Sequence, residues 1–377
     1  MSFHSTSSLA ISLRVNPLSV RRSLAAMCVV LSLTVQPAKA GELREATSAL
    51  RDGRIGYVLT HRYYSLYETE GGKTECPQGF NDGPREQFKT LYPPGKKLSV
   101  IDAQLQWEGS QWHPSTSKYR LPFHEGQGRI SYGLNLDGKV GAEDFLSPTG
   151  EPGIDNEFYR AIACIDSFRV GGSLYNFENT FLQQYPDSRL LIELTQVDDL
   201  VNDEEVIVTT YRGMNPLLSD ASGKHYLPGG TQRVDLRWSK DYVFKLKGKI
   251  VDGVLTTDPI DWIMVPWAMT ANVTAFQEFR GMRLRLKVTP ERAEGLMAGF
   301  IDVQRWHHAL NTNLSTHHMS YGRVSSPSVV AALARLADGY PDQTGRNTAI
   351  SASVDLKMVQ VYLVHPTSKA DLISSNR

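Results

Sequence analysis

Once its first 40 residues are set aside, the sequence lacks an apolar run long enough to cross a membrane as a helix. It also lacks an excess of charge of either sign, because 40 lysines and arginines balance 40 aspartates and glutamates. Residues 41–377 carry 36 basic and 40 acidic side chains, a net charge of about −4. This balance gives no electrostatic reason to expect DNA, RNA or an anionic lipid surface as a partner.

Sequence signatures of common hydrolases are missing as well. No G-x-S-x-G turn marks a nucleophilic serine, and no H-E-x-x-H marks a zinc protease. The acids Asp198, Asp199 and Asp203 lie between two expected strands, a position typical of a solvated turn. Glycosidases need two carboxyls at a set separation across a cleft, which sequence neighbours rarely provide. The sequence therefore predicts no catalytic residue, and whether the protein is an enzyme stays open.

The first 40 residues have the pattern of an export signal. A basic start with Arg21 and Arg22 precedes the apolar run Leu24 to Val35, and Ala38-Lys-Ala40 is a small-x-small cleavage site. Residues 1–40 are therefore predicted to be a signal peptide of the ordinary secretory kind, although the paired arginines faintly resemble a twin-arginine signal. We expect a secreted or periplasmic protein with no transmembrane segment after cleavage.

Cysteine is scarce, with three residues in the chain. Cys28 lies in the apolar run of the signal, so Cys76 and Cys164 are the two that remain after cleavage. In an oxidising compartment a disulfide between them is favoured, and two separate buried thiols are the alternative.

The rest of the chain is dominated by strand patterns. Runs of β-branched and aromatic residues, or of alternating apolar and polar residues, predict the strands and hairpins. These are Ile55 to Glu68, Arg189 to Val197, Glu205 to Arg212, Tyr242 to Thr256, Gly281 to Phe300 and Ala349 to Val364. Apolar residues at helical spacing predict the helices Asp155 to Phe168, Asn176 to Tyr185 and Pro327 to Asp338.

Helical patterns do not alternate regularly with the strands, so antiparallel connections are favoured over βαβ crossovers. We expect a mostly β protein with an antiparallel β-sandwich and a few peripheral helices. The sandwich domain is expected over residues 186–377, with its strands from Arg189 to Val364. Residues 41–185 are expected to form a smaller α+β region, which either adds strands to the sandwich or caps it.

One loop in that region has the order of a calcium-binding loop. A hard cation needs six to eight oxygen ligands, and acidic and amide side chains around a glycine turn provide them. The loop runs with Gly133 at position one, Asn135 at three, Asp137 at five, Gly138 at six, Lys139 giving its carbonyl at seven, and Asp144 at twelve. The run LDGKVGAEDF resembles the calcium loop of EF-hand and dockerin modules, and this resemblance implies bound Ca²⁺.

The loop departs from that pattern in two respects. Gly133 provides no carboxylate at position one, and the residues after Asp144 predict a turn instead of the exiting helix. Asp155 or Asn156 could supply the missing ligand if the chain folds back. The alternative interpretation is a polar Asp-Gly turn without a metal.

Two further groups are candidates for binding. The histidines His307, His308, His317 and His318 fall within twelve residues. Neutral imidazoles bind transition metals, but an exposed polar loop with incidental histidines is the alternative. Trp112 and Tyr119 lie in an irregular stretch, where an aromatic ring can stack on a sugar.

Three segments together resemble a group of secreted bacterial β-rich proteins of unassigned function. They are ECPQGFN from Glu75, LDGKVGAEDFLSPTGEPGIDNEFYRAIAC from Leu136, and ADGYPDQTGRNTAIS from Ala337. The resemblance implies export, and it favours Cys76 and Cys164 acting together, since each lies in one of these segments.

The sequence thus predicts an exported, non-catalytic β-sandwich protein that binds a partner protein or a glycan and is stabilised by Ca²⁺. The alternative is a secreted hydrolase with its site between the N-terminal region and the sandwich. A deep pocket with convergent carboxylates or histidines would favour the enzyme.

Overall fold

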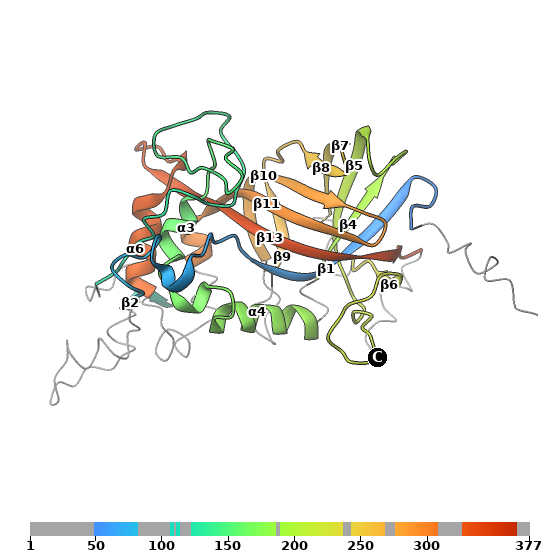
Figure 1. The fold of residues 1–377 in the computed structure, drawn as a ribbon, viewed down its shortest axis with the longest axis horizontal. Helices are drawn as coiled ribbons and strands as arrows, with labels where there is room; N and C mark the ends of the chain where they lie inside the picture. The colour runs from blue at the N-terminus through green and yellow to red at the C-terminus, as the bar shows by residue number, and fades with distance from the viewer. Residues whose placement is uncertain are drawn as a thin grey trace, which may run out of the picture. The chain divides into compact units, whose positions relative to one another are not determined.

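Eight strands form one closed antiparallel sheet in the computed structural model, which describes residues 49–81, 106–108, 111–113, 122–185, 189–236, 243–267, 276–307 and 326–367. The strands are β1 (Arg54–Tyr64), β4 (Leu190–Thr195), β5 (Asp203–Arg212), β7 (Phe244–Val251), β8 (Val254–Thr257), β10 (Phe276–Val288), β11 (Arg292–Asp302) and β13 (Asn347–Val364). They pair in this order, and β1 pairs with both β4 and β13, which closes the circuit into a barrel (Figure 1).

The expectation of a mostly antiparallel β protein is confirmed, but the sandwich is wrong. A sandwich would leave β4 and β13 as edges of separate sheets, whereas β1 hydrogen-bonds to both of them. Closure removes the unpaired edge groups that would otherwise promote aggregation. β1 comes from the N-terminal region, so the barrel includes a strand that lies well before residue 186.

Shorter strands extend the barrel wall. β6 (Gly230–Arg233) pairs in parallel with β13, β9 (Ile263–Pro266) pairs with β10, and β12 (Gly339–Pro341) pairs with β13. A separate two-stranded piece is formed by β2 (Gln106–Glu108) and β3 (Gln111–His113).

Side-chain alternation fills the barrel. On β13, Val354, Leu356 and Met358 are buried in the main apolar core, while Asp355 and Lys357 between them face outward. On β1, Arg62 is paired with Leu356 and is buried, whereas Tyr63 is only half-buried. Residues 49–367, where described, belong to one compact unit.

The helices are few and lie outside the sheet. They are α3 (Glu157–Ile162), α4 (Ser173–Gln184) and α6 (Ser326–Leu336), with short 3-10 turns η1 (Glu70–Gly72) and η2 (Asp166–Phe168). Helix α4 packs along β1, and α3 packs on α6 and β13 (Figure 1). Among the described helices, none is long and apolar enough to span a membrane.

The expected helix from Asp155 to Phe168 is interrupted after Ile162. The carbonyl of Cys164 accepts the backbone N–H of Asn81 at 2.8 Å, and the carbonyl of Ala163 accepts the Arg169 guanidinium at 3.2 Å. These tertiary hydrogen bonds occupy the carbonyls that would continue the helix, so the chain turns and resumes as η2.

Candidate functional site

An acidic cavity of about 550 Å³ lies where the loop around Asp137 meets α3, the end of α6 and strands β11 and β13. We define it by its charged lining. Six carboxylates and two arginines face it: Asp137, Glu143, Asp144, Asp155, Glu157 and Asp338, with Arg160 and Arg335. Three of these carboxylates, Asp137, Asp144 and Asp155, were predicted calcium ligands.

The loop is held on the outer face of the barrel by apolar and ionic contacts. Leu134 and Leu136 pack on Ala298 of β11. The Arg283 guanidinium of β10 donates hydrogen bonds to the carbonyls of Asn135 at 2.7 Å and Leu136 at 2.8 Å. A fork-like guanidinium that holds two successive carbonyls fixes the direction of the chain at the start of the loop.

Inside the loop, the predicted ligands close a turn around Gly138. The Oδ1 atom of Asn135 accepts the N–H of Gly138 at 2.7 Å, and its amide donates to the carbonyl of Lys139 at 2.6 Å. Asp137 accepts the N–H of Lys139 at 2.8 Å. Gly138 has a φ of 78°, a left-handed conformation in which glycine is favoured. A bound cation would have to replace or share these internal bonds.

Asp155, and not Asn156, folds back onto the loop. Its carboxylate accepts the N–H groups of Leu136 at 2.6 Å and of Asp137 at 3.3 Å. Burial raises the pKa of Asp155, the two N–H groups oppose the shift, and the charges of Asp137 and Asp144 add to it. The Asn156 side chain instead donates to the carbonyl of Tyr132 at 2.9 Å. Asp155 is therefore the acid placed to complete the predicted ligand set.

Two carboxylates on the other walls have raised pKa values. Burial raises the pKa of Glu157 to about 7, against the charge and hydrogen bond of Arg160, and the charge of Asp338 adds to the rise. Burial likewise raises the pKa of Asp338 to about 6, although Ser351 donates its N–H at 2.7 Å and its hydroxyl at 2.6 Å. The cavity therefore carries protons near neutral pH that isolated carboxyls would have lost.

Both arginines of the cavity already have partners. Arg160 is 2.9 Å from the Glu157 carboxylate and lies over the ring of Phe145, and Arg335 bonds to Glu125. In the part of the chain that the structure describes, Asp144, Asp155 and Asp338 have no salt-bridge partner. In the same part, no three His, Cys, Asp or Glu side chains form a group that could hold a metal ion as they stand. The lining is thus negative but not arranged as a finished metal centre.

Sequence reasoning did not place Glu143, Glu157 and Asp338 in one site. Glu157 has the position of an ordinary acid in the first turn of a helix, and Asp338 that of a residue at a helix stop. The usable signal was that all three lie in the resembling segments, Glu143 and Glu157 in the one from Leu136 and Asp338 in the one from Ala337. Their meeting depends on the contact of α3 with α6, which no local pattern predicts.

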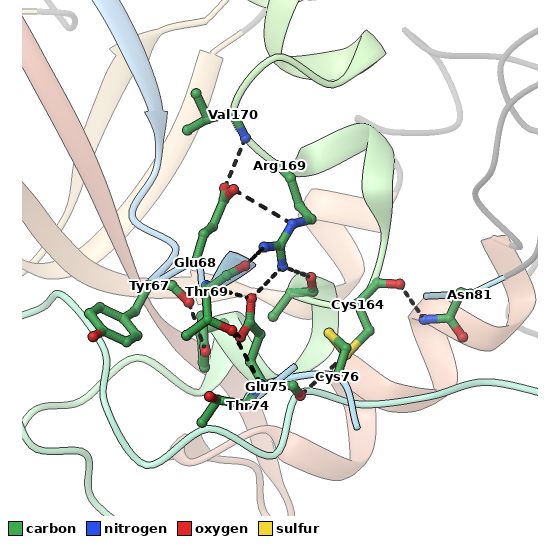
Figure 2. Close-up of polar contacts among 12 residues, drawn as sticks. Tyr67, Glu68, Thr69, Thr74, Glu75, Cys76, Asn81, Cys164, Arg169 and Val170 are labelled. Carbon is green, nitrogen blue, oxygen red and sulfur yellow. Dashed lines mark hydrogen bonds and ion pairs between the residues drawn. A yellow bond between two sulfur atoms is a disulfide. The ribbon is translucent and has the colours of Figure 1, made fainter. Parts of the chain in front are cut away.

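The disulfide between Cys76 and Cys164 is confirmed, with Cα atoms 5.5 Å apart and a sequence separation of 88. Next to it, Arg169 bonds to the buried carboxylate of Glu75 at 2.7 Å and lies 3.5 Å from Glu68 (Figure 2). Burial alone would raise the pKa of Glu75, but hydrogen bonds from Thr69 and Arg169 lower it below its ordinary value. This network fastens the segment after β1 to the end of α3.

Of the other predicted binding residues, the structure describes His307 and Trp112. His307 is buried, with 3% of its surface exposed, on a helical turn at 303–307. This contradicts an exposed loop at that residue. Trp112 lies on β3. The signal at 1–40 and residues Tyr119, His308, His317 and His318 lie outside the described residues.

Comparisons with family models, with curated proteins and with solved structures found no match. The class that the fold and site define is an antiparallel barrel, crosslinked by one disulfide, with an acidic cavity against its outer wall.

Proposed function

We propose that this is an exported, non-catalytic binding protein whose acidic cavity takes up Ca²⁺, which stabilises the surface that holds a partner or glycan. The observation that carries the proposal is the composition of the cavity, where six carboxylates face two arginines that are already bonded. Such an excess of negative charge in one cavity is relieved by a cation. The signal sequence, the resemblance to secreted bacterial proteins and the disulfide support export to an oxidising compartment.

The ligands in this proposal are the side chains of Asn135, Asp137 and Asp144, the carbonyl of Lys139, and Asp155 in place of the missing carboxylate at position one. Because the internal bonds of Asn135 and Lys139 must be exchanged, the affinity is weak. We expect a dissociation constant of about 0.1 to 1 mM, the range of extracellular calcium modules. Calcium at about ten times that constant would raise the free energy of unfolding by roughly 1.4 kcal/mol.

The test is a thermal melt of the mature protein in millimolar calcium and then in chelator, with magnesium as a second cation. We expect calcium to raise the melting midpoint and magnesium to raise it less. Asp137→Ala should abolish the response, whereas Asp199→Ala, an exposed acid outside the cavity, should keep it. An unchanged midpoint in the wild-type protein would contradict the proposal, and so would a full calcium response in Asp137→Ala.

A second candidate is a secreted hydrolase, and one observation favours it. Glu157, whose pKa is raised to about 7, is part-protonated at neutral pH, as a general acid must be. It shares a cavity between the N-terminal region and the C-terminal strands with Asp155 and Asp338. In this proposal Glu157 protonates the leaving group, and an ionised carboxylate activates water. Turnover of a glycan by the wild-type protein that is lost in Glu157→Gln would support the enzyme over the binding protein.

A further inference from the structure

A second surface, separate from the acidic cavity, gathers aromatic rings on the outer face of the barrel. We call it the tyrosine face. It consists of His61 and Tyr63 of β1, Tyr67 just after β1, Tyr132 of the loop before Leu134, Tyr175 of α4, and the charged residues Asp355 and Lys357 of β13. Four stretches that are distant in the sequence therefore contribute to one patch.

Ring contacts join these residues in two groups, one of His61, Tyr63 and Tyr175 and one of Tyr67 and Tyr132, and Tyr132 is near enough to Tyr63 to raise its pKa. The ring centres of Tyr63 and Tyr175 are 5.5 Å apart, and those of Tyr67 and Tyr132 are 6.0 Å apart. His61 hydrogen-bonds through Nε2 to the Tyr175 hydroxyl at 2.7 Å. These contacts hold the rings in fixed orientations, so little side-chain freedom remains to be lost when a ligand binds.

Core packing does not account for Tyr63 and Tyr132, although Tyr67 packs against the main apolar core. The neighbours of Tyr63 on β1, Arg62 and Tyr64, are on the inward side and are buried, whereas Tyr63 is only half-buried and Tyr132 is 39% exposed. Partly exposed tyrosines combine an apolar ring with a polar hydroxyl, a combination that favours recognition surfaces.

The charges of the tyrosine face cancel. Asp355 is paired with Tyr63 across β1 and β13, and its charge acts on both Tyr63 and Tyr132, so it lies near both side chains. Lys357 is paired with His61 in the next outward position. Burial and the charge of Lys357 lower the pKa of His61 to about 4, so His61 is neutral at physiological pH. Asp355 and Lys357 have opposite charges, and Glu68, whose charge also acts on Tyr63 and Tyr175, lies 3.5 Å from Arg169. The face therefore favours neither a cationic nor an anionic ligand.

The main-chain groups of β1 beneath the tyrosine face already have hydrogen-bond partners. Residues Tyr63 and Tyr64 of β1 pair with Val354 and Asp355 of β13, so this stretch of β1 has no free main-chain edge toward β13 for an added strand. On the opposite edge, where the pairing with β4 ends at Val58, the N–H and carbonyl of Arg62 bond to the Asn179 side chain at 2.9 and 2.8 Å. Recognition by side chains is therefore favoured over the addition of a peptide strand.

We propose that the tyrosine face is a docking surface for a neutral saccharide, with the Tyr63 and Tyr132 rings stacking on the C–H faces of sugar units and Asp355 accepting hydrogen bonds from their hydroxyls. The inference deepens the proposed function by naming the ligand class, and it depends on the binding role but not on the acidic cavity. A saccharide combines apolar C–H faces with hydroxyl edges, which matches rings set around a carboxylate.

The test is isothermal titration of the mature protein with three neutral oligosaccharides, cellohexaose, maltohexaose and chitohexaose. At least one should bind, and Tyr132→Ala should weaken it by about 3- to 10-fold, the loss expected for one aromatic contact. Tyr63→Phe, which keeps the ring, should retain most of the affinity, whereas Tyr63→Ala should not. Tyr185→Ala, which removes an exposed tyrosine at the end of α4 outside the face, is the matched control and should bind as the wild type does.

The outcomes separate this inference from the proposed function. No binding of any of the three saccharides would overturn the tyrosine face while leaving a calcium response of the melting midpoint intact. Binding that is unchanged in both Tyr132→Ala and Tyr63→Ala would also overturn it. A calcium response that persists in Tyr132→Ala together with weakened saccharide binding is the expected pair of results. It would also show that the variant is folded.

Discussion

The Nε atom of Arg62 lies 3.9 Å from a carboxylate oxygen of Glu178, and both side chains are buried. The guanidinium also lies 3.9 Å from the centre of the Trp267 ring and donates to the carbonyl of Pro266 at 3.1 Å. Strand β1, helix α4 and the end of β9 therefore meet at one desolvated charge pair. Such a pair is costly to break because the remaining charge has no water around it.

Removing one member of this pair should destabilise the protein strongly. We expect Arg62→Ala and Glu178→Ala each to lower the free energy of unfolding by about 3 to 5 kcal/mol. Glu178→Ala leaves a buried guanidinium without its counter-charge. Arg62→Ala leaves a carboxyl whose pKa burial already raises to about 7, and which must take up a proton to stay buried. The double variant Arg62→Met, Glu178→Leu should lose much less. Urea denaturation measures all three. Glu205→Ala, at an exposed acid, should change stability by no more than about 0.5 kcal/mol. Equal losses in the double and single variants would contradict the prediction.

The acidic cavity should make stability depend on pH. Glu157 has a pKa of about 7 in the folded protein against an ordinary value of 4.5, so the folded state binds its proton more tightly. Its contribution is therefore fully present below about pH 4.5 and is lost as the pH rises to about 7. In calcium-free buffer, Glu157→Gln should flatten this decline and gain about 1 to 3 kcal/mol on wild type between pH 5 and pH 8. Urea melts across that range measure the slope, and parallel curves for the two proteins would refute the assignment.

Local patterns were sufficient to predict most of the strands. The strand patterns at Arg189 to Val197 and Glu205 to Arg212 correspond to β4 and β5, and those at Tyr242 to Thr256 and Gly281 to Phe300 correspond to the hairpins β7–β8 and β10–β11. Helix α6 also lies where Pro327 and the following apolar residues predicted it. The closure of the sheet was not predictable. It depends on the pairing of β1 with β13, which lie near opposite ends of the chain, and the pattern of apolar and polar residues does not indicate which strands are neighbours.

Only part of the candidate site was predictable, because local sequence patterns do not show which distant segments meet. Asp137, Asp144 and Asp155 belong to one stretch of sequence, and they do line one cavity. Asp338 reaches it from the end of α6, so its approach to Glu157 is a result of helix packing. The tyrosine face, too, was predictable only in part. The sequence marks Tyr63 and Tyr67 as strand aromatics, but only the fold brings Tyr132 and Tyr175 to them.

The disulfide should contribute a large share of the stability. Because Cys76 and Cys164 are 88 residues apart, the crosslink restricts a long loop of the unfolded chain. The Cys76→Ala, Cys164→Ala variant should lose about 2 to 5 kcal/mol in urea denaturation. The unreduced, denatured mature protein should show no free thiol, and two free thiols would contradict the crosslink. Addition of a reductant should lower the stability of the wild type but leave that of the variant unchanged.

The last prediction concerns Arg169, which supports the same segment by charge. The Glu75 side chain is 1% exposed, and Arg169 is its cationic partner at 2.7 Å. In Arg169→Met that carboxylate stays buried without a counter-charge, and we expect a loss of about 3 to 5 kcal/mol near neutral pH. In the wild type the pKa of Glu75 is lowered, so its contribution is present above the ordinary pKa and is lost as the pH falls. In the variant the hydrogen bonds from Thr69 remain, but without Arg169 the pKa of Glu75 rises, so the variant loses less stability as the pH falls. The difference in the free energy of unfolding between the two proteins should therefore narrow from pH 7 to pH 4 in urea denaturation.

The control is Arg129→Met, which removes an exposed arginine 3.9 Å from Glu143 and should lower the free energy of unfolding by no more than about 1 kcal/mol. A gap that stays constant or widens in acid would show that Arg169 acts by packing on Phe80 and not by holding the charge of Glu75.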